Sequence, residues 1–418
     1  MDTFDKVYVM MFGISNIVAG GPIYNANKIR FLESKGWNVV VFPVDSGKVY
    51  IKPLEKYNNN SYDFIHFSPY IFGKRKTEKF VEKMASLIPQ SDEIIVETGT
   101  DYTALWGELL AKKLKARHIV MFLDERNENI NSYSSPFYEF KYKRNELYSI
   151  SQKSLTYIFS PYFKIESPEK NVWNAWCSNS VESIESDVPE LLPKADYMIG
   201  SIGRLDKSFV SNIISGVCAF SDKHRENSIG LCMFGGADDK TILQIKKEIQ
   251  LHHNIKLFIS GYIWPIPAAV FPRFDIFISG AGAARVSANM GIQTVNMDVI
   301  TNEPTGLIDN PSEFHCVPLK GANKDVQDYL TAVLIENDKI EIHNTVSIEK
   351  KWEIICKDFC DQLRHIEAID TPLIYFDTSK IWDHRKIHKI QSYLAHLLDY
   401  KTFLTVQKLY GWFKVIGL

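Results

Sequence analysis

The sequence predicts an α/β protein made of two successive doubly wound halves. Short apolar runs rich in β-forming residues alternate with longer segments of helical period, and this alternation restarts near the middle of the chain. An acidic stretch with two prolines, residues 183–193, separates the two series. At 418 residues the chain is also longer than one hydrophobic core usually organises.

Six apolar runs in the first half predict strands. They are Val7–Phe12, Val39–Val44, Phe64–Phe67, Glu93–Glu97, Ile119–Leu123 and Thr156–Phe159. Amphipathic stretches between them, such as Ile23–Lys35 and Tyr102–Leu114, predict crossover helices. This pattern is typical of a parallel sheet covered by helices on both faces.

Six further runs predict the strands of the second half. They are Tyr197–Ile202, Ser228–Phe234, Ile255–Ser260, Ile276–Ser279, Thr294–Met297 and Phe314–Pro318. We expect domains at residues 1–182 and 183–365, with C-terminal helices over 366–418. In two such domains, ligands bind where the carboxyl ends of both sheets face each other across a cleft.

Composition excludes several classes of protein. The chain is 45% hydrophobic and 23% charged, as in ordinary globular proteins. Its net charge of -2 and pI of about 6.6 provide no positive field for a polyanion, so we expect no nucleic-acid partner. There is no apolar signal core at the start, and no uninterrupted apolar stretch of the roughly 18 residues that a membrane span needs. These features predict a cytoplasmic protein.

The six cysteines are scattered, which predicts reduced, buried thiols instead of a disulfide framework. Cys356, Cys360 and His365 are spaced so that the two cysteines share one helical face. Because a fourth ligand is missing, the spacing favours helix packing over zinc, and we predict no metal site.

A glycine pair follows the first predicted strand. Gly20 and Gly21 permit close backbone approach, and Pro22 suits the first turn of a helix. The N-terminus of that helix would point at the cleft, where its free N–H groups and dipole favour a phosphate or another anion. The alternative is an ordinary turn between strand and helix.

The second half opens with a strand that ends in two cations, Arg204 and Lys207. Arginine can bind phosphate oxygens through two hydrogen bonds, while lysine supplies a point charge. Both would stabilise the negative charge that builds on a departing nucleoside diphosphate. The alternative is that both are solvated loop residues.

Small residues follow the predicted strand at 276–279. Gly280, Gly282 and Ala283 leave room for a ligand against the backbone, and Ser287 lies where it could bond a ribose or phosphate. The alternative is that small residues here allow tight packing of helix on sheet.

The order of these motifs resembles the GT-B family of retaining glycosyltransferases, which includes bacterial capsule, exopolysaccharide and lipopolysaccharide enzymes. The resemblance spans about residues 7 to 335. Its motifs are the glycine pair, residues 36–42, 158–162 and 179–181 in the first half, and 203–207, 234–238, 254–262 and 274–278 in the second.

The resemblance implies a GT-B fold and transfer of a sugar, with retention, from a UDP- or GDP-sugar to a surface glycan or lipid-linked acceptor. The donor residues that it implies are Gly20, Gly21, Arg204, Lys207, Gly235, Tyr262, Gly280, Gly282, Ala283 and Ser287. There is no Asp-x-Asp signature, and the cations can replace a metal, so we expect metal-independent activity without a cofactor.

Two departures from the family pattern leave a second function open. The family carries two glutamates eight positions apart near the donor, but residues 278–291 contain no carboxylate. Arg204 and Lys207 are only three positions apart, where the family has a longer interval. A divergent enzyme or a catalytically silent subunit that binds an acceptor or a partner protein would explain both. Glu303 could replace the ribose contact, or lie in a surface turn.

Four residues of the first half fall at or near the ends of predicted strands: His66, Glu97, Asp101 and Asp124. A carboxylate or imidazole there could orient or deprotonate an acceptor hydroxyl. The resemblance favours Asp124, and we add His66 as the second catalytic candidate; the alternative is a helix cap or a hydrogen-bonded core group. A sugar-nucleotide 2-epimerase of the same fold is a third function, which we rank last because residues 279–287 lack the expected histidine and carboxylates.

The C-terminal stretch is basic and apolar. Residues 380–418 contain seven Lys or Arg against two Asp, with apolar residues at helical spacing. We expect helices that pack back on the first domain or lie on an anionic membrane, which would make the protein peripheral on the inner face of the plasma membrane.

Overall fold

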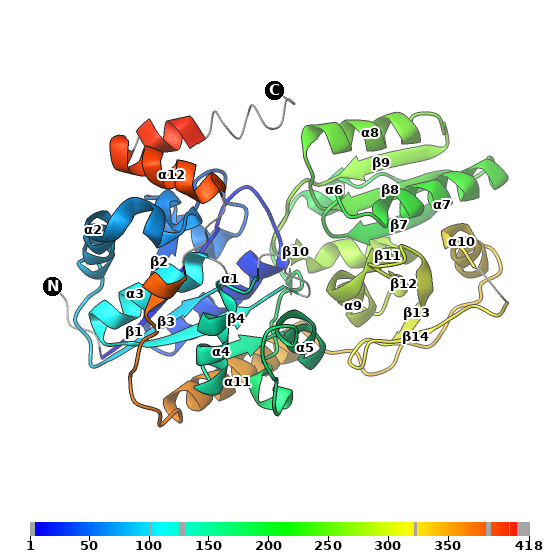
Figure 1. Ribbon diagram of the computed structural model, residues 1–418. Helices are drawn as coiled ribbons and strands as arrows, with labels where there is room; N and C mark the ends of the chain where they lie inside the picture. Colours follow the sequence, from blue (N-terminus) through cyan, green and yellow to red (C-terminus); the bar gives the residue numbers. More distant parts are fainter. Residues whose placement is uncertain are drawn as a thin grey trace.

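The computed structural model describes residues 5–99, 102–124, 130–321, 324–381, 386–400 and 402–407. It contains two open sheets, one in each half of the chain, and the two halves form adjacent lobes (Figure 1). The predicted α/β class with two sheets is therefore confirmed.

The first sheet has five parallel strands in the order β2-β1-β3-β4-β5. The strands are β1 (Lys6–Phe12), β2 (Asn38–Pro43), β3 (Glu93–Thr98), β4 (Arg117–Phe122) and β5 (Leu147–Ser149). The helices are α1 (Gly20–Ser34), α2 (Gly73–Ala85), α3 (Tyr102–Leu114), α4 (Ser135–Lys143) and α5 (Gln152–Phe159). Successive residues of a strand point to opposite faces, so Tyr8 packs with α1 while Val9 packs with α2 and α3.

The second sheet has seven strands in the order β14-β13-β12-β11-β7-β8-β9, and its first two are antiparallel to their neighbours. The strands are β7 (Tyr197–Ile202), β8 (Ile229–Phe234), β9 (Ile255–Ile259), β11 (Ile276–Gly280), β12 (Gln293–Met297), β13 (Pro304–Asn310) and β14 (His315–Val317). The helices are α7 (Val210–Lys223), α8 (Asp239–Ile249), α9 (Ala281–Asn289) and α10 (Val326–Leu334). Two short strands, β6 (Val181–Glu182) and β10 (Ile266–Pro267), pair beside the linker helix α6 (Val188–Leu191).

Two predicted strands are wrong. Residues 64–67 fall in a 3-10 turn, Asp63–His66, in which the N–H of Phe67 donates to the carbonyl of Phe64 at 3.1 Å. Residues 156–159 belong to α5, because the Ser151 hydroxyl caps this helix by accepting from the N–H of Ser154 at 3.0 Å. The strands β5 and β13 were not predicted; β5 is only three residues long and its sequence has no distinct period.

Helix α11 (Ile348–Glu367) returns the chain to the first half. Although it falls inside the range predicted for the second domain, its buried residues Ile355, Phe359 and Leu363 pack in the same core cluster as Tyr8 of β1. We therefore propose that the chain crosses back before Ile348, with the other domain limits as predicted from the sequence.

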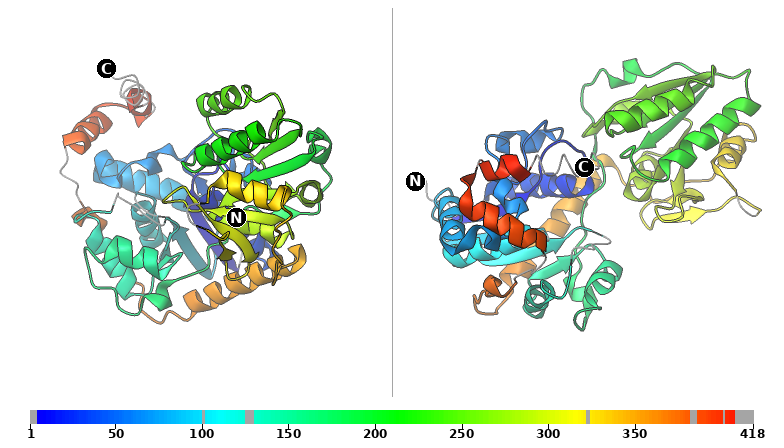
Figure 2. Two further views of the ribbon diagram at one scale, coloured as in Figure 1. Left: turned by 90° about the vertical axis from the view of Figure 1, so that its right-hand side faces the viewer. Right: turned by 45° about the horizontal axis from the view of Figure 1, so that its top comes forward.

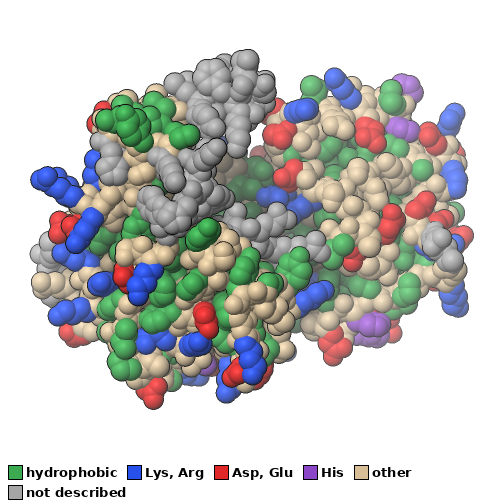
Figure 3. Space-filling model, in the orientation of Figure 1, with side chains coloured by type: hydrophobic (Ala, Val, Ile, Leu, Met, Phe, Trp, Pro, Cys, Tyr) green, Lys and Arg blue, Asp and Glu red, His purple; other side chains and the backbone are tan. Residues whose placement is uncertain are grey.

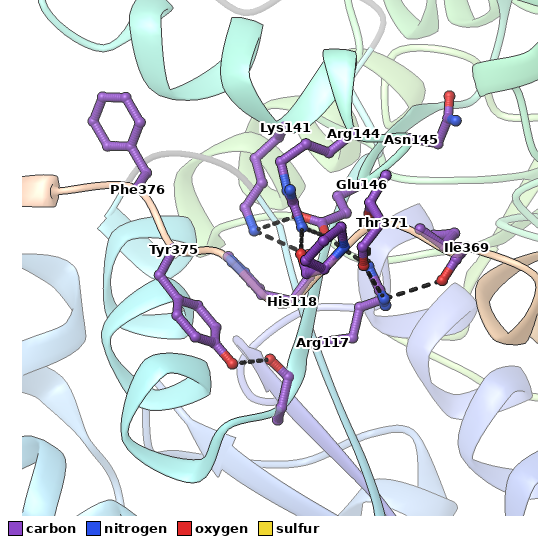
Figure 4. Close-up of polar contacts among 12 residues, drawn as sticks. Arg117, His118, Lys141, Arg144, Asn145, Glu146, Ile369, Thr371, Tyr375 and Phe376 are labelled. Atoms are coloured by element: carbon purple, nitrogen blue, oxygen red, sulfur yellow. Dashed lines mark hydrogen bonds and ion pairs between the residues drawn. The ribbon is translucent and has the colours of Figure 1, made fainter.

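Two arginines hold the chain on the first half after α11 (Figure 4). Arg117 donates to the carbonyl of Thr371 at 3.0 Å, and Arg144 to that of Pro372 at 2.6 Å. Both guanidinium groups also pair with Glu146, at 2.9 and 3.1 Å. The following helix, α12 (Lys386–Leu397), lies on the first half in Figure 1 and in the right-hand view of Figure 2.

Within the described ranges, no helix combines the length and the apolar character that crossing a membrane requires.

Candidate functional site

A cavity of about 230 Å³ opens at the carboxyl edge of the first sheet. It lies at the ends of β1, β3 and β4 and the start of α1. In the order β2-β1-β3, the crossovers reverse direction between β1 and β3, and such a switch point is where open α/β sheets bind ligands. The lining residues are Met11, Phe12, Gly13, Gly21, Pro22, Tyr24, Asn25, Glu97, Thr98, Gly99, Met121, Leu123 and Asp124.

Glu97 lines this cavity and is fixed by a buried network. Its carboxylate accepts hydrogen bonds from the hydroxyls of Tyr8 (2.6 Å) and Tyr24 (3.2 Å) and forms an ion pair with Lys28. Lys28 also donates to the Tyr24 hydroxyl at 3.0 Å and to the side-chain oxygen of Gln362 on α11 at 3.3 Å. The carboxylate is therefore held in one position by donors from α1 and β1, and its lysine partner connects it to α11.

Aromatic rings surround the same lysine. The Lys28 ammonium lies between 5.3 and 5.8 Å from the ring centroids of Tyr8, Tyr24, Trp173 and Phe359. Burial lowers the pKa of Lys28, against the opposing effect of Glu97. Burial and the charge of Glu97 raise the pKa values of Tyr8 and Tyr24 well above the usual range, so both hydroxyls stay donors.

Helix α1 begins at the glycine pair, as the sequence predicts for a helix start after the first strand. Gly21 lines the cavity, whereas Gly20 packs against Cys177: a Cβ at position 20 would lie 3.1 Å from the Cβ of that cysteine. Asp45 fixes the loop that precedes the helix by accepting from the N–H groups of Ile14 (2.8 Å) and Ser15 (3.2 Å). The N-terminus of α1 therefore borders the cavity.

The four polar candidates of the first half have different outcomes. Asp124 and Glu97 both line the cavity, where Asp124 is exposed just after β4. His66 does not line it: it is an exposed residue of a 3-10 turn, and the strand end on which its proposed role rested does not exist. Asp101 lies outside the described residues.

In the second half, the loops after β7, β8 and β11 converge. A Cβ at Gly235 would lie 1.7 Å from the carbonyl oxygen of Gly203, so only glycine allows the loops after β7 and β8 to approach this closely. Of the residues that follow β11, Ala283 in the first turn of α9 lies nearest to Gly203. The strand order reverses between β7 and β11, so this is the switch point of the second sheet.

Arg204 lies at this convergence. Its side chain is 30% exposed, and its Nε lies 3.2 Å from the carboxylate of Asp206 without the geometry of a hydrogen bond. The Nε atom itself is buried and has no hydrogen-bond partner. Lys207 lies on the exposed turn that leads into α7, where its carbonyl accepts from the N–H of Val210. Arg204 is thus the cation that the structure places at the switch point.

Tyr262 connects the two halves. Its ring lies against Gly236, and its centroid is 5.1 Å from that of Tyr50 in the first half. Burial raises the pKa of Tyr262, and the nearby charges of Asp206 and Arg204 act on it in opposite directions. The surface is hollowed between the two lobes, with Lys or Arg side chains on the wall of the hollow (Figure 3).

Two other residues predicted near the donor serve the fold. The space beside Gly280 is filled, since a Cβ there would lie 2.9 Å from the ring of Phe209. Ser287 is fully buried, with its hydroxyl bonded to Ala284 (3.1 Å) and Thr294 (3.0 Å), so it cannot reach a ribose or phosphate. For these two positions the packing alternative is correct.

Gly282 lies in the first turn of α9 and faces the first half of the chain. It approaches Ser178 of the first half so closely that a Cβ would lie 2.3 Å from the serine hydroxyl. Glu303 is exposed in the turn before β13, and its carboxylate accepts weakly from the Asn212 amide at 3.5 Å, as expected for a surface residue.

Lys28 and Tyr50 are site residues that the sequence did not predict. Lys28 lies in a helix of which nine of the fifteen residues are buried. A lysine among the apolar positions of such a helix is the signal that could have marked it. Tyr50 lies outside the regular elements, so no periodicity marks it. Over the described residues, no three His, Cys, Asp or Glu side chains gather as a metal site would require. Cys356 and Cys360 of α11 pack against the first core cluster, as predicted, but both are partly buried instead of fully buried.

No protein-family model matches this chain, and no curated protein matches it. Solved structures do resemble it. A glycosyltransferase from Rickettsia africae is 15% identical, with a TM-score of 0.54 over 88% of this chain and 98% of that one. S. aureus MnaA, solved with UDP, is 13% identical, with a TM-score of 0.50 over 87% and 97%. Anabaena HepE, also solved with UDP, is 12% identical, with a TM-score of 0.50 over 87% and 99%.

At these identities the likeness shows the fold. The two switch points, the linker between the sheets and the helices that return to the first half agree with it. The chain has the GT-B fold, with two Rossmann-like domains facing across a cleft and C-terminal helices.

Proposed function

We propose that this protein is a glycosyltransferase that moves a sugar from a UDP- or GDP-sugar, with retention, to a surface glycan or a lipid-linked acceptor. The proposal rests on the buried Nε atom of Arg204, which has no hydrogen-bond partner. A buried guanidinium nitrogen without a hydrogen-bond partner, at the switch point of a sheet, is a donor in need of an acceptor, and a diphosphate oxygen would satisfy it.

The surroundings of Arg204 support a nucleotide at this place. Gly235 brings backbone close to Arg204, Ala283 lies next to the preceding residue Gly203, and Tyr262 offers an aromatic ring beside Arg204. Two structures with the same fold were solved with UDP. Arg204 would stabilise the leaving diphosphate by charge, and Lys207 would contribute from the rim.

The acceptor would enter the cavity of the first half. Asp124 would orient or deprotonate the attacking hydroxyl. Gly21 at the N-terminus of α1 would bring the donor phosphate close to this hydroxyl. We expect activity without a metal ion, because the cation at the cleft takes over the neutralisation of charge. We place the protein in the cytoplasm, at the inner face of the plasma membrane where lipid-linked acceptors lie.

One observation favours a second function, a non-catalytic subunit that binds an acceptor or a partner protein. The loop and helix at residues 278–291 contain no carboxylate that could hold the donor sugar. Such a subunit would bind the nucleotide but would not turn over its sugar conjugate.

The test is release of UDP or GDP from a panel of nucleotide-sugars, with glycan and lipid-linked acceptors. The proposal predicts release from one donor, unchanged by EDTA, and a product that keeps the anomeric configuration. Nucleotide binding without release under any condition would contradict it and favour the second function.

A further inference from the structure

Helix α12 packs along one side and exposes large apolar side chains on another. Leu394, Ala395 and Leu398 pack into the core cluster that covers α2 and α3, and Ala395 is only 2% exposed. Lys76 of α2 fixes the end of the helix by donating to the carbonyls of Ala395 and, at 3.3 Å, Leu398. The orientation of α12 is therefore set by these contacts.

An adjoining side of α12 presents three large apolar side chains to solvent. Ile390, Tyr393 and Leu397 are 58%, 67% and 63% exposed. Their spacing of three and four residues aligns them along one side of the helix. The upper left of Figure 3, where Figure 1 places α12, shows a group of hydrophobic side chains at the surface. Scattered apolar residues are normal at a surface, but an aligned row indicates a binding face.

The helix that contacts the end of α12 is rich in exposed cations. Helix α2, which Lys76 ties to α12, exposes Lys74, Arg75, Lys79 and Lys83 against two carboxylates, Glu78 and Glu82. The sequence from 380 to 418 adds seven Lys or Arg against two Asp. Apolar side chains with adjoining cations match an anionic bilayer, whose surface attracts lysine and arginine and whose interior accepts apolar groups.

We infer that α12 and α2 form a docking face for an anionic membrane, in which Ile390, Tyr393 and Leu397 insert between lipids while Lys74, Arg75 and Lys79 contact their headgroups. Tyrosine suits this depth, because its ring is apolar and its hydroxyl stays in the polar layer. This inference specifies the membrane contact of the proposed function, but it requires no catalysis.

Sedimentation with lipid vesicles tests it. The native chain is expected to bind vesicles of phosphatidylcholine mixed with phosphatidylglycerol and to bind pure phosphatidylcholine far less. A variant with Lys74→Gln, Arg75→Gln and Lys79→Gln should lose about fivefold in partitioning for each cation removed. A variant with Ile390→Ser, Tyr393→Ser and Leu397→Ser should lose binding to both kinds of vesicle.

Matched controls come from the other half. Leu243 and Leu251 are 53% and 76% exposed, and Lys246 and Lys247 are exposed on α8, so their substitution to Ser and Gln should leave vesicle binding unchanged. Failure of the native chain to bind, or equal losses in the controls, overturns the inference. So does a native dimer that the Ile390, Tyr393 and Leu397 variant converts to a monomer, since the face would then serve self-association.

UDP-induced thermal shifts, measured on the same variants, distinguish failure of the docking face from failure of the proposed function. The docking variants should keep the native shift. Vesicle binding without any nucleotide shift would sink the proposed function alone and leave the docking face intact.

Discussion

Lys28 on α1 and Glu97 at the end of β3 form an ion pair in which both side chains are buried, at 0% and 3% exposure, beside the cavity of the first half. Removing one partner of such a pair leaves an uncompensated charge in the core. Lys28→Met should therefore lower the free energy of unfolding by about 3–5 kcal/mol in urea titrations.

The exposed pair of Lys56 and Glu33 is the control for that variant. With side chains 52% and 38% exposed, it should contribute no more than about 1 kcal/mol, so Lys56→Met should unfold at nearly the native midpoint. A loss for Lys28→Met as small as that of the control would show that the buried network does not exist as described.

Acid should destabilise the buried group of Glu108, His118 and Lys141. Burial raises the pKa of Glu108, but Lys141 and the hydrogen bond from His118 (2.7 Å) outweigh it and lower the value to about 2. Burial and Lys141 also lower the pKa of His118 below its ordinary 6.5. Since both groups bind protons more readily in the unfolded chain, stability should fall as the pH drops, first below 6.5 and then between 4.5 and 2.

The lowered pKa of Glu108 corresponds to a contribution on the order of 3 kcal/mol to the free energy of unfolding above pH 5. Urea unfolding from pH 7.5 to 4 measures the slope. In His118→Gln the decline between pH 7 and 5 should become shallower, while His343→Gln, at an exposed histidine, should keep the native slope. An unchanged slope in His118→Gln would contradict the assignment.

Asp124→Asn tests the acceptor side. Because the amide cannot take a proton from an acceptor hydroxyl, turnover of the active donor should fall about 10²–10⁴-fold. The UDP-induced thermal shift should persist, since Asp124 lies in the other half from the donor loops. Asp187→Asn, at an exposed linker position, should keep native turnover; equal rates in all three proteins would exclude Asp124 from the reaction.

Gly235→Ala tests the close approach of the loops after β7 and β8. Its new Cβ would overlap the carbonyl of Gly203, so the loops must separate, at a cost of about 1–3 kcal/mol and with loss of nucleotide binding. Gly21→Ala is the matched control for stability alone, since Gly21 is itself a proposed donor contact: its Cβ would meet Leu123 at an ordinary 3.8 Å, and we expect native stability. Calorimetry without UDP compares the stabilities of the two variants, and calorimetry with UDP tests nucleotide binding in Gly235→Ala against the native chain.

The alternation of apolar runs was sufficient to predict the two sheets, because parallel strands buried on both faces carry continuous apolar stretches. The same alternation gave wrong strands where a segment is short, or where it is apolar because it packs in a turn or a helix. Phe64 stacks on Phe80 at 4.3 Å, so the aromatic run at 64–67 serves a tight turn within a core cluster. Residues 156–159 look extended only when the capping serine at 151 is ignored.

The location of a polar residue at the sheet edge could be predicted where the residue follows a strand end. The location of other residues could be predicted less well. Arg204 and Asp124 follow strands directly, and topology alone places them at the sheet edges. Ser287 was misplaced because helical phase decides whether a residue one turn into α9 faces the cleft or the sheet, and here it faces Thr294. Lys28 depends on partners 69 and 334 positions away, which no local pattern reveals.

The most direct measurement of the central claim is thermal unfolding with UDP, GDP, CMP and ADP, for the native chain and Arg204→Ala. A ligand that binds only the folded state raises the melting temperature, by an amount that grows with its concentration relative to Kd. We predict a shift with UDP or GDP that disappears in Arg204→Ala and persists in Lys246→Ala. No shift with any nucleotide, or an undiminished shift in Arg204→Ala, would contradict the proposed donor site.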